Sequence, residues 1–172
     1  MERLYDMEEH YKGKKYSDDI MELLNSFNQD YYTTNSVLNI VINDKVELGN
    51  TYGIDISCKL NDVSLDFMRE IDVTTIFANL LDNAIAAAKD VKQNPYILLK
   101  ANKVQEFIVI SIINSCNDKT LDGSEKLMSS KKKHEGLGLG NVKMALEKYD
   151  GHMRIEREED EFKVNLFIPI EE

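Results

Sequence analysis

The chain has 172 residues, of which 42% are hydrophobic and 30% charged, a composition typical of one globular domain with a modest appendage. Its formal net charge of −10 and pI near 4.8 argue against a nucleic-acid binder, which needs a basic face. No apolar run approaches the roughly 20 residues that a membrane span requires, so we expect no membrane contact by this chain. Cys58 and Cys116 match no metal or redox spacing, which favours a reducing, cytoplasmic compartment.

The first 32 residues predict a short helical hairpin. Leu4, Met7 and Tyr11 repeat at helical spacing, Gly13 interrupts the pattern, and it resumes over residues 16–31. A hairpin this short buries its apolar stripe only against another surface, either the rest of the chain or a second copy. We therefore divide the chain into a hairpin over 1–32 and a main domain over 33–172.

Residues 33–60 predict a helix followed by a strand. Thr33 to Ser36 supply capping side chains, and the helix is expected to end near Gly53, because glycine readily adopts the left-handed conformation found there. Residues 54–60 then alternate between apolar and polar, as a strand does. The expected buried side of the helix consists of Val37, Leu38, Val41, Ile42, Val46 and Leu48.

A second helix, from about Asp72, carries two asparagines beside its apolar face. Asn79 and Asn83 are four residues apart, so they project from one side of the helix. Amides near a buried face need partners. The pair either bonds to neighbouring backbone or forms a ligand site in which an amide oxygen contacts a hard cation. The expected apolar face consists of Ile76, Leu80, Ile85, Ala87 and Ala88.

The rest of the chain predicts two hairpins separated by a loop and a helix. Residues 96–103 and 106–114 form the first hairpin, whose second strand is apolar enough to be central, and residues 152–158 and 161–168 form the last. Residues 115–135 are polar and lack periodicity, and a loop of this length inside a domain is usually functional. The element order predicts an α+β fold, a mixed sheet with helices on one face.

Glycines alternate over residues 136–140, at the expected start of the helix after this loop. Such glycines let the backbone approach a ligand closely, with free N–H groups and the positive helix end aimed at it. This arrangement favours an anion, most naturally phosphate. The expected inward side of the helix is Val142, Ala145, Leu146 and Tyr149.

The asparagine helix and the glycine turn together resemble the GHKL ATPase superfamily, which includes sensor histidine kinases, gyrase-type enzymes and related chaperones. Asn79-Leu80-Leu81-Asp82-Asn83-Ala84 resembles the N box of histidine kinases, and residues 136–142 resemble their second Gly box. The resemblance covers about residues 33–172 and implies a two-layer α/β sandwich. Asn114-Ser115-Cys116 is similar to the Asn-x-Cys of the branch that reads quorum-sensing peptides. The hairpin resembles the end of the dimerisation and phosphoacceptor helices, which implies a possible homodimer.

The resemblance also implies roles for single residues. Asn83 gives its amide oxygen to a Mg²⁺ ion that bridges the ATP phosphates, and Asn79 supports the metal and phosphates from one turn earlier. Asn114 lies where most of the superfamily has an Asp that accepts a hydrogen bond from the adenine amine, a bond that an uncharged oxygen makes more weakly. Residues 117–135 are the ATP lid. The expected phosphate cradle is Gly136, Leu137, Gly138, Leu139 and Gly140, within reach of Lys131, Lys132 or Lys133 of the lid.

The sequence departs from the family pattern around the adenine. The Asp-x-Gly-x-Gly of the first Gly box is missing, and Asn114-Ser115-Cys116 stands there instead. A Lys often found three residues after the second N-box Asn is Ala86, and Lys89 lies on another face of the helix. A Thr that holds adenine through water corresponds to Asp160 or Glu161.

The expected reaction is phosphotransfer rather than hydrolysis. Hydrolases of the superfamily activate water with a Glu one turn before the metal Asn, and Asn79 at this position is no general base. We therefore expect the Mg·ATP-binding catalytic domain of a two-component sensor histidine kinase, with a response regulator as partner and a membrane-embedded sensor in the full-length protein. None of His10, His134 and His152 fits the phosphoacceptor, so we expect that histidine upstream and no autophosphorylation of this chain.

Two alternatives remain open. A degenerate GHKL domain that serves as an interaction module is favoured by the altered first Gly box and opposed by the intact N box and second Gly box. An anti-sigma-type serine kinase shares the nucleotide fold but lacks an N-terminal helical hairpin.

Overall fold

The structure, a computed structural model, describes residues 33–60, 63–117 and 132–170. The predicted hairpin over 1–32 and most of the predicted lid lie outside these ranges. The elements in chain order are α2 (Ser36–Thr51), β1 (Asp55–Leu60), α3 (Glu70–Ala88), β2 (Tyr96–Val104), β3 (Phe107–Ser115), α4 (Lys132–Glu147), β4 (His152–Arg157) and β5 (Glu161–Pro169). This order is the predicted one.

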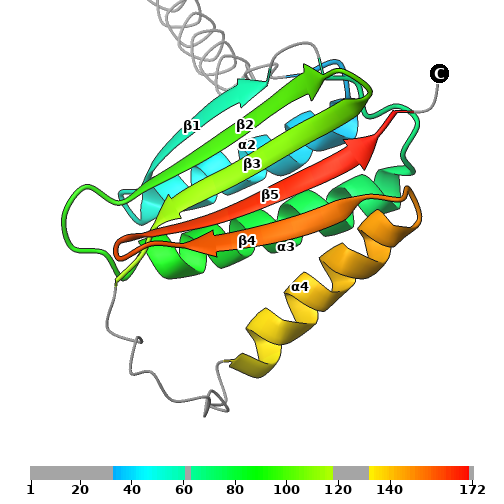
Figure 1. The fold of residues 1–172 in the computed structure, drawn as a ribbon. Helices are drawn as coiled ribbons and strands as arrows, with labels where there is room; N and C mark the ends of the chain where they lie inside the picture. The colour runs from blue at the N-terminus through cyan, green and yellow to red at the C-terminus, as the bar shows by residue number, and fades with distance from the viewer. Residues whose placement is uncertain (1–32, 61–62, 118–131, 171–172) are drawn as a thin grey trace, which may run out of the picture. The chain divides into compact units, whose positions relative to one another are not determined.

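The five strands form one mixed sheet in the order β1-β2-β3-β5-β4. β1 pairs with β2 in parallel, and the other neighbours are antiparallel. The three helices lie on one face of this sheet (Figure 1). Both the α+β fold class and the central place of β3 are confirmed.

α2 begins and ends where the sequence predicts, but one buried position is wrong. The side chain of Asn35 caps the helix by accepting a hydrogen bond from the backbone N–H of Leu38 at 2.9 Å. Leu48, expected inside, is 36% exposed, and its neighbour Gly49 is buried instead. A Cβ atom on residue 49 would clash with the end of the Ile56 side chain, so β1 approaches the helix closely at Gly49 and a larger residue there would require Ile56 to move.

α3 supplies much of the core between the helices and the sheet. Ile76, Leu80, Ile85 and Ala88 are buried as predicted, whereas Ala87 is half-buried. By length and composition alone, with 19 residues and a mean hydropathy of 1.2, α3 also meets the criteria for a membrane span, contrary to our expectation. Half of this segment is buried, and its apolar side packs under the sheet.

α4 begins at Lys132, so the segment 136–140 lies inside the helix rather than ahead of it. The prediction of a structureless lid is therefore wrong for residues 132–135. These residues include no glycine or proline, and each glycine that follows costs a helix only about 1 kcal/mol relative to alanine. The predicted inward residues Val142, Ala145 and Leu146 are buried, while Tyr149 is half-buried beyond the helix end.

Candidate functional site

Asn79 and Asn83 lie on the side of α3 that faces α4, where Gly138 meets them. A Cβ atom on residue 138 would lie 3.1 Å from Asn79 Oδ1 and 3.7 Å from Asn83 Nδ2. Gly138 is buried and both asparagines are half-buried. The backbone of α4 therefore rests on the two amides, and the structure brings together two motifs that are about fifty residues apart.

The two asparagines differ in their partners. Asn79 Nδ2 donates a hydrogen bond to the carbonyl oxygen of Thr75 at 2.6 Å. This backbone bond was one of the alternatives that the sequence left open, and it fixes the amide whose oxygen approaches Gly138. Within the described ranges the side chain of Asn83 makes no hydrogen bond, so its oxygen is available to a cation. Each alternative therefore fits one residue of the pair.

Asp82, which lies between the asparagines in the N box, is turned towards α2. Lys45 Nζ lies 2.9 Å from its carboxylate and 3.1 Å from that of Asp44. This ion pair fastens α2 to α3 and partly neutralises the negative charge closest in sequence to the two amides.

Asn114 ends the row of buried β3 side chains that faces the helices. Ile108, Ile110 and Ile112 precede it in this row, and Asn114 itself is 2% exposed. Its Nδ2 donates to the carbonyl oxygen of Ser115 at 2.9 Å. No donor within the described ranges reaches its Oδ1. A buried carbonyl oxygen without a donor is costly, so this atom fits a ligand amine.

Phe162 is the β5 residue opposite Asn114. The sequence placed the family's adenine-contacting Thr at Asp160 or Glu161. In the structure Glu161 pairs with Ser115, so it lies on the other face of the sheet. Glu161 is therefore not beside Asn114, and the aromatic ring of Phe162 occupies the position opposite Asn114 on β5.

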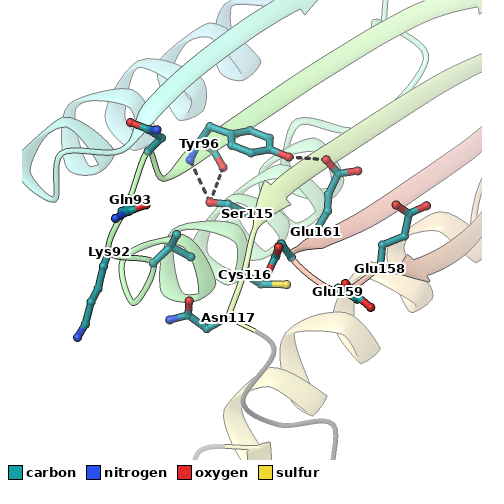
Figure 2. Close-up of a pocket in the computed structure, with 12 residues that line it drawn as sticks. Lys92, Gln93, Tyr96, Ser115, Cys116, Asn117, Glu158, Glu159 and Glu161 are labelled. Carbon is teal, nitrogen blue, oxygen red and sulfur yellow. Dashed lines mark hydrogen bonds between the residues drawn. The ribbon is translucent and has the colours of Figure 1, made fainter.

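A cavity of about 830 Å³ opens at the same end of the sheet, and Asn79, Asn83 and Gly138 do not line it. Figure 2 shows its wall, where the Tyr96 hydroxyl donates to Glu161 and the Tyr96 N–H donates to the Ser115 hydroxyl at 3.0 Å. The hydrogen bond to Glu161, together with burial, raises the pKa of Tyr96 to about 12. Four consecutive acidic residues, 158–161, line this cavity and make it unsuitable for a triphosphate.

A buried carboxylate joins the start of α3 to the segment after α4. Asp72 is 2% exposed and accepts hydrogen bonds from Arg69 Nε at 2.8 Å, Lys148 Nζ at 2.6 Å and the Tyr149 hydroxyl at 2.7 Å. Hydrogen bonds from Arg69 first, and then from Lys148, hold the pKa of Asp72 well below its ordinary value. From the sequence, Asp72 was predicted only to lie near the helix start, because no local pattern links residues 72 and 148.

The other predicted site residues belong to α4 or lie outside the described ranges. Leu137 is 61% exposed and Leu139 is half-buried. Gly140 faces open space, with no neighbour within 4 Å of an added Cβ atom. Gly136, Lys132 and Lys133 belong to α4, and Lys131 lies outside the described ranges.

Two features of the described residues fit a nucleotide, whereas the metal would depend largely on ligands from outside the protein. Gly138 leaves room that a Cβ atom would fill, and Asn114 Oδ1 lacks a donor. Across the described ranges no three His, Cys, Asp or Glu side chains are grouped as a metal site. A Mg²⁺ ion at Asn83 would therefore take most of its ligands from phosphates and water, as this ion usually does.

A family model described as the GHKL domain matches residues 68–169, which include α3, Asn114 and α4. No curated protein matches the chain. Among solved structures, the nucleotide-free catalytic domain of histidine kinase ThkA is 20% identical, with a TM-score of 0.61 over 79% of this chain and 91% of that one.

Two further structures agree. The Acinetobacter baumannii histidine kinase AdeS is 12% identical, with a TM-score of 0.60 over 91% of this chain and 77% of that one. Full-length ShkA in complex with AMPPNP is 18% identical, with a TM-score of 0.56 over 79% of this chain and 30% of that one. At these identities the likeness shows the fold, a mixed sheet with helices on one face.

Proposed function

Because the chain belongs to the GHKL domain family, we propose that it binds Mg·ATP and donates the γ-phosphate to a histidine, as the catalytic domain of a two-component sensor histidine kinase. The carrying observation is the contact of Gly138 with Asn79 and Asn83. It brings the glycine segment of α4 next to an amide oxygen suited to the metal. The AMPPNP in the ShkA complex supports a nucleotide in this fold.

The residues of the chain act mainly by holding the nucleotide. Mg²⁺ would neutralise charge on the phosphates, and Asn83 would anchor it by its amide oxygen. Asn79 keeps its oxygen near the phosphate site through its bond to Thr75. Asn114 Oδ1 would accept a hydrogen bond from the adenine amine. Phosphoryl transfer needs little beyond such positioning and charge neutralisation.

ATP binding requires α4 to start one turn later than it does in this structure. The N–H groups of residues 136–139 lie inside the helix, where they normally bond to carbonyls one turn earlier. Unwinding of residues 132–135 frees these groups to bind phosphate while Gly138 stays against the asparagines. In the nucleotide-free chain, we expect the amides of residues 132–139 to exchange hydrogen faster than those in the rest of α4. With Mg·ATP bound, we expect the amides of 136–139 to become protected from exchange.

The chemistry points to transfer rather than hydrolysis. Asn79 stands where a general base would be needed, and an amide does not accept a proton from water at neutral pH. His152 begins β4 and its Nδ1 lies 3.0 Å from the carbonyl oxygen of Asp150, while His134 belongs to α4. We therefore propose that the acceptor histidine lies outside the described residues. We also propose a cognate response regulator and a dimer partner, and a cytoplasmic location for the chain.

The test is a calorimetric titration of ATP with and without Mg²⁺, on the chain and on Asn83→Ala. We expect binding that strengthens with Mg²⁺ in the wild type and loses its Mg²⁺ dependence in Asn83→Ala. Asn50→Ala, an exposed asparagine at the end of α2, is the matched control and should bind as the wild type does.

One observation favours the interaction module as a second candidate. α4 is helical through the predicted phosphate cradle, so the cradle is closed in this structure. Absence of Mg²⁺-dependent binding at millimolar ATP would decide for the module and against the kinase.

A further inference from the structure

α3 and α4 touch at two separate polar places. The first is Gly138 on Asn79 and Asn83. The second is Asp72, which binds Lys148 and Tyr149 just after α4. Since Asp72 is near the start of α3 and its partners follow the end of α4, the two helices run antiparallel.

The spacing of these two places matches along both helices. Residues 72 and 81, the latter midway between the asparagines, are separated by about 14 Å of helix, and residues 138 and 148 by about 15 Å. Contact at Asp72 therefore sets how far α4 can slide along α3. At Gly138 a slide of one residue replaces glycine by a residue with a side chain.

The Asp72 contact is built to resist sliding. Its side chain is 3% exposed, and three donors from two segments surround it. Tyr149 also accepts the backbone N–H of Arg69 at 2.9 Å, and its ring packs edge-on against Phe67 at 6.2 Å between centroids. Within the described ranges Asp72 is the one charged residue among the buried ones.

From this geometry we propose that Asp72, with Lys148 and Tyr149, is a positioning residue that fixes the register of α4 on α3 and so holds Gly138 over Asn79 and Asn83. The proposal rests on the proposed function, since it assigns the contact a role in binding the triphosphate. Asp72 itself touches neither phosphate nor metal. Its loss lets α4 shift at the phosphate end while Asn114, on β3, keeps its place.

The test compares ATP with adenosine. In Asp72→Asn we expect Mg·ATP affinity to fall about tenfold, because misplacement by an ångström is costly to binding and chemistry, while adenosine affinity is unchanged. Lys148→Met, in a side chain that is 47% exposed, should fold readily and give a smaller loss of the same kind. Glu156→Gln is the control, because it also replaces a paired carboxylate by an amide, but in an ion pair on β4.

Equal weakening of ATP and adenosine, or no change in either, would overturn the proposal. If the wild type binds no ATP, the proposed function fails, and a second measurement decides on Asp72. Gly138→Ala and Gly140→Ala are compared by urea denaturation with Asp72 intact and in Asp72→Asn. Residues this far apart normally act additively. If Asp72 sets the register, the difference between the two alanine variants shrinks in Asp72→Asn; an unchanged difference rejects the proposal.

Discussion

Gly138→Ala should leave the stability of the nucleotide-free chain nearly unchanged, although alanine is the better helix former. Alanine in place of glycine inside a helix gains about 1 kcal/mol. Here the new Cβ atom would lie 3.1 Å from Asn79 Oδ1, so the amide must move by a few tenths of an ångström. That motion strains the 2.6 Å bond to Thr75, and losing such a bond costs about 1 kcal/mol. The two effects offset each other.

Gly140→Ala is the matched control, because an added Cβ atom there meets nothing within 4 Å. Its free energy of unfolding should rise by the full benefit of alanine over glycine in a helix, about 1 kcal/mol. The two variants should therefore differ in stability by about that amount. Urea denaturation followed by circular dichroism measures both. If Gly138→Ala gains as much stability as Gly140→Ala, α4 does not pack against the asparagines, and the contact on which the candidate site is based is refuted.

Three further outcomes follow from the structure. Asp72 contributes stability that is complete above the ordinary carboxyl pKa near 4 and is lost as pH falls towards its depressed pKa, so acid denaturation of Asp72→Asn should show a shallower dependence on pH below about 4 than the wild type. Asn114→Ala should weaken adenosine binding about fivefold by calorimetry, since it removes one hydrogen bond to the amine, and unchanged affinity would place adenine elsewhere. The pKa of Tyr96 is raised to about 12, so its hydrogen bond stabilises the fold below pH 10 and is lost as pH rises towards 12; thermal denaturation of Tyr96→Phe should therefore show a smaller loss between pH 10 and 12.

Local sequence patterns were sufficient to predict most helices and strands, but they did not predict the contacts between these elements. Alternation of apolar and polar residues over 54–60 located β1 within one residue, and the predicted hairpin strands located β2, β3 and β5 within a residue or so. Leu48 was misplaced since its exposure depends on how closely Ile56 approaches Gly49, a contact across two elements. The start of α4 was missed because the glycines suggested a break, whereas their neighbours from residue 132 continue the helix.

The site shows the same division. The motifs predicted Asn79, Asn83, Asn114 and Gly138, since spacing along the chain carries that signal, and the structure brings Gly138 to the two N-box asparagines. The residue opposite Asn114 on β5, Phe162, could not be predicted, because the register between distant strands leaves no local pattern and a shift of one residue along a strand reverses the face. The role of Asp72 depends on Lys148 and Tyr149, which lie far from it in the chain, so a single sequence does not reveal the contact.

β1 and β2 run parallel, so the chain must cross the domain between them, and α3 is that crossing. The hairpins β2–β3 and β4–β5 close locally, whereas β1 joins only after a long loop has been brought together. We therefore expect docking of α3 and addition of the edge strand to occur in one kinetic phase, which also brings Asn79 and Asn83 to their places. During refolding, the Asn83 amide should reach its place in the same phase as the β1–β2 pairing, while α4 is free to dock before or after it.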